Sequence, residues 1–247
     1  MLRLSQLLFY LVNAKANTTE IIKDVPYGED IDQKYDEYPS DNPNAPLAVF
    51  WHGGGWKNGN KNMYRFVGHS LQAMGAHAFI IGYPKFPKRK FPSFIEDAQQ
   101  ALIQIKTRYP SRRVVLLGHS AGAHTALLLG LSKTKLADRV VSISGVCTLS
   151  PKWKPVFGDA LDNGLSDPRT YVKTANKDTS FLLIHGYLDY IVAFSDSVSL
   201  NRLLAKDGIK SRLILILIDH SLILPFLFIG PLYFTRRRIK KFILVNS

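Results

Sequence analysis

The chain has 247 residues, of which 46% are hydrophobic and 21% charged, a composition that excludes a largely disordered protein. Single α/β domains commonly reach this length, so we expect one domain over residues 1–247. The single cysteine, Cys147, excludes an intrachain disulfide and is expected to be an inert buried thiol. No cysteine-rich or histidine-rich spacing accompanies it, so the sequence predicts no metal site.

The net charge is +13 at pH 7, from 32 Lys and Arg residues against 19 Asp and Glu residues. Such an excess suits an anionic membrane surface or a nucleic acid. No nucleic-acid-binding motif accompanies the charge, and the cations are scattered except at residues 85–90 and 236–241. We therefore expect no nucleic-acid partner, and a surface that favours solubility or peripheral membrane contact through the C-terminal segment.

The first sixteen residues resemble a secretory signal in outline, with Arg3, an apolar run and the small residues of 14–16. The apolar run at 7–12 is shorter than the usual minimum of about seven residues. Leucines recur at the spacing of one helical face, namely at Leu4, Leu7, Leu8 and Leu11. The sequence therefore favours an amphipathic helix and a cytoplasmic protein. A secreted or periplasmic protein is the alternative if residues 1–16 act as a signal peptide.

Strand-like and helix-like segments then alternate. A hairpin is expected first, with strands at 24–27 and 34–38. Helices are expected at 63–74, closed by Gly75, and from a capping box at Ser93 to the Tyr109-Pro110 stop. Short apolar runs predict buried strands at 47–51, 78–81, 114–117, 140–144, 181–184 and 213–218. This order predicts the α/β class, with a mostly parallel twisted sheet and helices on both faces.

Regular periodicity lapses between Gly145 and Asp178. Aromatic residues and prolines punctuate this stretch, which lies between two predicted strands. We therefore expect a short cap or lid insertion at about residues 146–178, placed where it covers the site.

A G-x-S-x-G motif follows the predicted strand at 114–117, and good helix formers follow the motif at 123–129. This strand–turn–helix context is typical of a nucleophile elbow. Gly118 and Gly122 allow the close backbone approach of the sharp turn, which exposes Ser120 at a helix N-terminus. The N–H groups and the dipole of that terminus favour a developing oxyanion, so the sequence predicts Ser120 as nucleophile.

A serine nucleophile needs a general base. Beyond the elbow and its helix the chain has two histidines, His185 and His220. His220 follows the last predicted strand, where the base of this fold is expected, whereas His185 precedes any plausible acid loop. The sequence therefore predicts His220 as the base and a packed or backbone-bonded His185.

Asp189 lies in the loop after the predicted strand at 181–184 and is the predicted acid, which orients the imidazole and stabilises its cation. Asp219 is one alternative, but adjacent residues in extended chain face opposite ways, so it should point away if His220 points into the site. Asp196 is the other alternative, although Asp196 with Ser197 is more typical of a helix start.

The oxyanion also needs donors that are aimed before the substrate arrives. The loop His52-Gly53-Gly54-Gly55-Trp56 is suited to this role, because glycine lets backbone N–H groups turn inward. The predicted donors are the N–H groups of Gly53, Gly54 and Ala121, and His52 is expected to anchor the loop. Three aromatic residues are candidate substrate-binding walls, with ordinary packing as the alternative for each: Trp56, Tyr83 and Trp153.

These motifs resemble the esterase and lipase branch of the α/β-hydrolase superfamily that carries an HGGG-type oxyanion loop, and are also similar to its arylformamidase-like members. The resemblance rests on HGGGW, GHSAGAH, HGYLDYIV and Asp219-His220. It implies an acyl-enzyme mechanism without a cofactor, with roles for Ser120, Asp189, His220, Gly53, Gly54 and Ala121. Pro84 and Ala193 depart from the family pattern, where arginine and proline are frequent, and neither position belongs to the triad.

The resemblance implies cleavage of small carboxylic esters. An arylformamidase or amidase on the same triad is the alternative, because the same chemistry expels an amine when His220 protonates the leaving nitrogen. A non-catalytic binding protein on this fold is the third reading, and a broken triad would be its signature.

The segment 221–234 is strongly apolar but contains two prolines and has 14 residues, fewer than the ~20 that span a bilayer. We expect it to be buried packing or one wall of an acyl pocket. Peripheral membrane contact is the second expectation, because the basic run at 236–241 follows directly.

Overall fold

The computed structural model describes residues 20–245. The helix expected near the N-terminus, together with the signal-peptide alternative, lies outside these residues.

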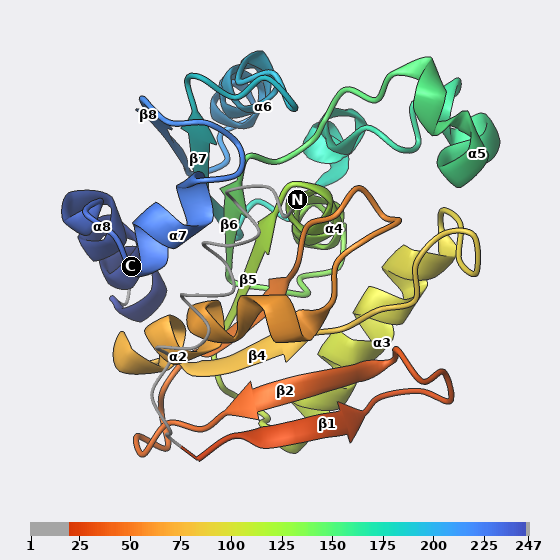
Figure 1. Cartoon of the computed structure of the whole chain (residues 1–247). Coiled ribbons are helices and arrows are strands. Elements are labelled where there is room, and N and C mark those ends of the chain that lie inside the picture. The colour runs from red at the N-terminus through yellow and green to blue at the C-terminus, as the bar shows by residue number, and fades with distance from the viewer. Residues whose placement is uncertain (1–19, 246–247) are drawn as a thin grey trace, which may run out of the picture.

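An eight-stranded sheet forms the centre of the molecule, in the order β1-β2-β4-β3-β5-β6-β7-β8. The hairpin of β1 (Ile22–Pro26) and β2 (Lys34–Tyr38) lies at one edge and β8 at the other (Figure 1). The hairpin is antiparallel, and β2 also pairs antiparallel with β4. The remaining pairs are parallel. These six strands are β3 (Leu47–Trp51), β4 (His77–Ile81), β5 (Val114–His119), β6 (Arg139–Ile143), β7 (Ser180–Gly186) and β8 (Ser211–Ile216).

Each predicted strand is present, with its ends within two residues of the expected positions. The interior strands β3 to β6 are buried at every residue, because helices cover both faces of the sheet. The edge strand β8 instead alternates, and it exposes Arg212 and Leu215. The expected α/β class with a mostly parallel sheet is confirmed.

One face of the sheet packs against α3 (Ser93–Arg108), α4 (Ala121–Gly130) and α6 (Ser195–Lys206). The other face packs against α2 (Arg65–Ala73), α7 (Ile223–Phe228) and α8 (Tyr233–Leu244). The sequence placed the start of the second predicted helix one residue too late. Pro92, not Ser93, is the N-cap of α3, and no side chain caps this helix, so the expected capping box does not form.

Between β6 and β7 the chain forms only short turns of helix. They are the 3-10 segments Pro151–Trp153, Gly158–Leu161 and Pro168–Thr174, and α5 (Lys154–Phe157). We call residues 146–178 the cap. Its Val156 and Phe157 are buried against Trp56 and Phe94 in a third apolar cluster, which fastens the cap over the glycine loop after β3.

The apolar segment after His220 is largely core. Ile223, Leu224, Leu227 and Phe228 of α7 are buried in the same cluster as α2. The expectation of buried packing is therefore met for α7, and only Ser221 from this segment reaches the cleft described below. Among the described residues, no helix combines the length and the apolar character that a membrane span requires.

Candidate active site

The turn between β5 and α4 holds Ser120 in a strained conformation, with φ 54° and ψ −120°. A non-glycine residue in such a region costs on the order of 1–3 kcal/mol, which the surroundings must hold in place. A Cβ on Gly118 would lie 2.2 Å from the Gly122 carbonyl oxygen, and one on Gly122 would lie 2.1 Å from that of Trp51. Both positions therefore require glycine. The Ser120 N–H donates to Ile143 at 3.0 Å and ties the elbow to β6.

Asp189 and His220 meet from two different strand ends, after β7 and after β8. The His220 Nδ1–H donates to Asp189 Oδ2 at 2.7 Å. Asp189 Oδ1 accepts the backbone N–H groups of Ile191 and Val192 at 3.0 and 2.8 Å, which orients the carboxylate. With Nδ1 engaged as a donor, Nε2 is the ring nitrogen of His220 that is left to accept a proton.

His185 is a second donor to the same carboxylate. It is fully buried, its Nε2 lies 3.3 Å from Asp189 Oδ2 and 3.1 Å from the Val192 carbonyl oxygen, and its Nδ1 lies 2.7 Å from Ser197 Oγ. Burial by itself raises the pKa of Asp189, but hydrogen bonds from His185 and His220 hold it well below its usual range. Asp189 is therefore an anion at neutral pH, and the sequence did not foresee the contact from His185.

The two rival carboxylates have other partners. Asp219 Oδ1 accepts the N–H groups of Ser221 and Leu222 at 2.7 and 3.0 Å, so it holds the turn that follows β8. Asp196 accepts three hydrogen bonds from the start of the cap: Oδ2 from the N–H groups of Cys147 and Thr148, and Oδ1 from Thr148 Oγ1. Neither contacts His220, which leaves Asp189 as its partner.

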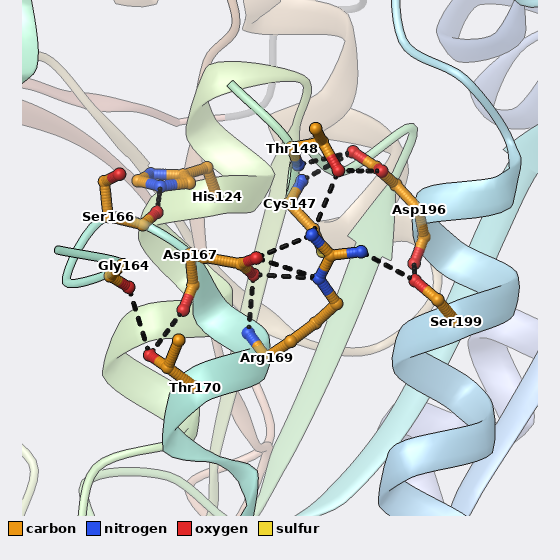
Figure 2. Close-up of polar contacts among 10 residues, drawn as sticks. All are labelled: His124, Cys147, Thr148, Gly164, Ser166, Asp167, Arg169, Thr170, Asp196 and Ser199. Atoms are coloured by element: carbon orange, nitrogen blue, oxygen red, sulfur yellow. Dashed lines mark hydrogen bonds and ion pairs between the residues drawn. The ribbon is translucent and has the colours of Figure 1, made fainter. Parts of the chain in front are cut away.

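Figure 2 shows that the hydrogen bonds between Asp196 and the start of the cap are part of a larger network, which also includes Arg169 near the end of the cap. The Arg169 guanidinium pairs with Asp167 at 2.6 Å and donates to Thr148 Oγ1 and Ser199 Oγ at 3.0 and 3.1 Å. Asp196 and Ser199 belong to α6, so the network joins both ends of the cap to that helix. Burial raises the pKa of the Cys147 thiol, and the charges of the neighbouring Asp196 and Asp167 raise it further. The thiol is therefore neutral, and it is buried as expected.

The glycine loop after β3 differs in detail from the prediction. The backbone N–H of Gly53 donates a hydrogen bond to the Tyr64 hydroxyl. Burial raises the pKa of this hydroxyl to about 12, and the hydrogen bond opposes the rise. A Cβ on Gly53 would also lie 2.9 Å from His119 Nδ1, so the residue packs behind the elbow and does not line the cleft. Gly54 and Gly55, with φ of 129° and 60°, do line it. Within residues 20–245 their N–H groups donate to no protein acceptor.

Ala121 is the first residue of α4, so its N–H has no partner inside the helix. The N–H groups of Gly54, Gly55 and Ala121 are thus available for an oxyanion. Only Gly54 and Ala121 were predicted from the sequence. Gly53 was chosen because the three glycines are equivalent in sequence, and only the path of the loop distinguishes them.

A cleft of about 720 Å³ opens at the carboxyl ends of the strands, with Ser120 and His220 in its wall. Of the predicted aromatic walls, Trp56 and Trp153 line the cleft, their rings in edge contact at 5.0 Å. Tyr83 does not. Its hydroxyl donates to the His52 carbonyl oxygen at 2.9 Å and its ring stacks on His52, so it supports the loop from below. The lining also includes four residues of the cap that the sequence did not single out, Val146, Thr148, Ser150 and Lys152.

His119, the residue before the nucleophile, also lines the cleft. Its ring centroid lies 4.7 Å from that of His220, and its Nε2 lies 3.2 Å from the His220 carbonyl oxygen. Burial lowers the pKa of His119 well below its usual value, and the nearby His220 lowers it further. His119 is therefore a neutral ring that packs against the predicted base. In the sequence, only its position between Gly118 and Ser120 indicates that His119 lies at the site.

Comparisons with known proteins show similarity to hydrolases in sequence and in fold. The family model described as BD-FAE matches residues 36–148. Kynurenine formamidase from Danio rerio is 32% identical over 116 residues, which are 46% of this chain and 40% of that protein. Versiconal hemiacetal acetate esterase from Aspergillus parasiticus is 30% identical over 131 residues, or 51% of this chain and 39% of that protein. The chain thus spans about two-fifths of the length of these curated relatives.

Solved structures match over almost the whole chain. A truncated carbohydrate esterase from gut microbiota has a TM-score of 0.78 at 19% identity, with 93% of this chain and 96% of that chain covered. Esterase B from Lactobacillus rhamnosis has a TM-score of 0.79 at 18% identity, with 95% and 89% covered. At such identity the likeness establishes the fold. The fold of this chain is therefore that of the α/β-hydrolase esterases.

Proposed function

We propose that the chain is a serine hydrolase that cleaves small carboxylic esters through an acyl-enzyme intermediate. The observation that carries the proposal is the 2.7 Å hydrogen bond between His220 and Asp189, beside the strained Ser120 in one cleft. A structural role for Ser120 alone requires neither the strain nor a buried carboxylate–imidazole pair at the same cleft.

In the proposed acylation step, Ser120 Oγ bonds to the carbonyl carbon of the ester while its proton passes to His220 Nε2. The carbonyl oxygen becomes an oxyanion, which the N–H groups of Gly54, Gly55 and Ala121 stabilise. When the tetrahedral intermediate collapses, the bond to the alcohol oxygen breaks, and His220 gives its proton to that oxygen. Asp189 compensates the positive charge on the ring during both transfers.

Deacylation repeats the sequence with water. His220 removes a proton from the water as its oxygen bonds to the acyl carbon, and the bond to Ser120 Oγ then breaks. The proton returns from His220 to Ser120, and the carboxylic acid leaves. The proposed cycle needs no redox partner or cofactor, since each proton taken up by His220 is released in the same half-reaction.

The size and lining of the cleft support a small substrate. Its volume of about 720 Å³ lies within the range of about 300–1,000 Å³ that is typical of small-molecule sites. Trp56 and Trp153 supply apolar walls near the glycine loop, and a Cβ on Gly55 would lie 2.8 Å from the Trp153 ring. The cap therefore packs directly on the proposed oxyanion donors, and it limits the acyl group that fits.

Arylformamidase activity is the second candidate. It is favoured by the match to kynurenine formamidases from two fishes, at 32% and 28% identity. The same nucleophile would attack a formyl carbon, and His220 would protonate the leaving amine. Comparing kcat/KM for aryl acetates and for N-formyl arylamines distinguishes an esterase from an arylformamidase. The substrate with the higher kcat/KM identifies the activity.

The experiment that tests the proposal is labelling of the purified protein with a fluorophosphonate probe, followed by peptide mapping. The expected adduct lies on Ser120, and it is absent from Ser120→Ala and much slower to form in His220→Ala. A folded wild-type protein that takes no label would support the non-catalytic alternative and contradict the proposal.

A further inference from the structure

Cations gather on α8 and at the start of β8. None of these side chains forms an ion pair within the part of the chain that the structure describes, although carboxylates elsewhere pair with Lys61, Lys88 and Arg108. We call this set the α8 surface: Lys210, Arg212, Arg236, Arg237, Arg238, Lys240 and Lys241. A concentration of unpaired positive charge on one side of a protein attracts an anionic partner.

Two hollows flank α8, and the residues that line them indicate which kind of anionic partner fits. The hollow toward α2 has a volume of about 640 Å³ and is lined by Arg236, Arg237, Lys240 and the apolar Met74 and Phe228. The hollow toward β8 has a volume of about 320 Å³, with Lys210, Arg212, Arg238 and Lys241 around Phe181 and Phe242. Neither described lining contains an Asp or a Glu. Each hollow therefore combines a cationic rim with an apolar floor.

Aromatic residues stand at the N-terminal end of the same helix. The Phe234 side chain is 79% exposed and that of Tyr233 is 50% exposed. The guanidinium groups of Arg236 and Arg237 lie 5.6 and 5.8 Å from the centre of the Tyr233 ring. Exposed aromatic rings beside cations are typical of segments that lie at the interface between water and lipid headgroups.

The helix that carries these groups is held rigidly. Thr235, Ile239 and Ile243 face inward and are buried in the core. Arg113 donates to the carbonyl oxygens of Ile243 and Leu244 at 2.6 and 2.7 Å, which satisfies the C-terminal end of the helix. Because its apolar stripe is already used in the fold, α8 can lie on a surface but cannot insert its apolar face into one.

We propose that the α8 surface docks the protein on an anionic phospholipid bilayer. The cations meet the headgroup phosphates, Phe234 reaches the acyl region just below them, and the recessed apolar floors take up the hydrocarbon part of a lipid that enters a hollow. A nucleic acid also offers phosphates, but its sugar–phosphate backbone has no apolar part for the floors of the hollows. Docking is independent of the proposed hydrolysis, since no residue of the α8 surface lines the cleft that holds Ser120.

The test is flotation of the purified full chain with vesicles of phosphatidylcholine alone, and of phosphatidylcholine mixed with phosphatidylglycerol, at low and high salt. We expect binding to the mixed vesicles only, and release at high salt because the attraction is screened. The double variants Arg237→Glu/Lys240→Glu and Arg238→Glu/Lys241→Glu should each weaken partition at least about tenfold. Phe234→Ser should weaken it less, because one ring contributes fewer contacts than two charges.

Lys173→Glu/Lys177→Glu is the matched control, because it changes the net charge equally at exposed positions in the cap. It should retain binding, and esterase turnover with a soluble ester should be unchanged in all these variants, which shows that they fold. Equal loss in the control would reduce the effect to net charge and overturn the proposal. So would a failure of the wild-type chain to bind the mixed vesicles, or tighter binding to duplex DNA or RNA that Phe234→Ser leaves unchanged.

Discussion

Substitutions of Asp196 test whether this residue holds the cap in place or takes part in catalysis. Its carboxylate is 5% exposed and accepts three hydrogen bonds from the cap, at 2.8, 2.8 and 2.7 Å. Asp196→Ala removes all three and leaves the buried N–H of Cys147 and the part-buried N–H of Thr148 without their acceptor. Asp196→Asn keeps one oxygen for both N–H groups, but it loses the charge and puts an NH2 group where Thr148 Oγ1 had its acceptor.

The expected magnitudes follow from these contacts. A hydrogen bond to a charged group contributes about 1.5–3 kcal/mol, and each buried donor that is left unpaired costs about 1–3 kcal/mol. Since these terms describe the same contacts and are not additive, we expect Asp196→Ala to lower the free energy of unfolding by about 4 kcal/mol. Asp196→Asn should cost about 1–2 kcal/mol. At about 2–4 °C per kcal/mol for a chain of this size, the melting temperature should fall by about 8–16 °C and about 2–8 °C respectively.

Thermal unfolding and steady-state kinetics with a short p-nitrophenyl ester together provide the assay. Because the cap lines the cleft, both variants should raise KM. In Asp196→Asn, kcat should stay within a few-fold of wild type, since Asp196 does not contact His220. Asp189→Asn should instead lower kcat by about 10³–10⁴-fold, because it removes the charge that orients the base. Asp178→Asn, the same change at an exposed position, is the control and should alter neither quantity.

A kcat that collapses in Asp196→Asn while Asp189→Asn is nearly normal would refute this reasoning. It would exchange the roles of the two carboxylates and mean that the hydrogen bond between Asp189 and His220 is not the one used in turnover.

Four further results are expected. Ser120→Ala should abolish turnover and probe labelling without unfolding the protein, and labelling that persists would place the nucleophile elsewhere. His185→Phe should lower kcat about tenfold at unchanged KM, because Asp189 loses one of its charge-stabilising donors; an unchanged kcat would make His185 a packing residue only. Burial raises the pKa of Glu37, but hydrogen bonds from His77, Tyr109 and Arg108 lower it from 4.5 to about 2. The ionised Glu37 therefore contributes about 3 kcal/mol of stability above pH ~4.5, and this contribution is lost as the pH falls towards 2. In Glu37→Gln the free energy of unfolding should not show this loss between pH 4.5 and 2, and an identical pH dependence in the variant and the wild type would contradict the prediction. Finally, p-nitrophenyl esters of roughly C2 to C6 should show higher kcat/KM than C12 or C16, because a chain that extends beyond a cleft of this size gains no transition-state contact. A profile that rises to C16 would mean that a larger acyl site forms.

Much of the fold could be predicted because its signals are local. The apolar runs that became β3 to β7 reflect burial on both faces of the sheet, which demands apolar side chains at consecutive positions. The nucleophile elbow could also be predicted, because contacts within the turn and with the neighbouring strand require the spacing of Gly118, Ser120 and Gly122.

The errors occurred where neighbours in sequence are chemically alike or where the relevant neighbour is distant. Gly53, Gly54 and Gly55 cannot be ranked from sequence, and only the path of the loop brings Gly54 and Gly55, but not Gly53, into the lining of the cleft. Tyr83 was as plausible a wall as Trp153 until the fold placed its ring against His52. The capping box at Ser93 failed by one residue, because helix ends depend on the backbone before them as well as on the capping side chain.

The strands in their order along the chain, the elbow and the types of residue available for a triad could therefore be predicted from the amino-acid sequence, because each depends on spacing along the chain; the helices α7 and α8 were not predicted. Only the tertiary structure decided which of them meet. The bond between Asp189 and His220 joins residues 31 positions apart, and the chain positions of Asp196 and Thr148 differ by 48. The parallel sheet brings such partners together because its loops converge at the carboxyl ends of neighbouring strands, wherever along the chain those strands occur.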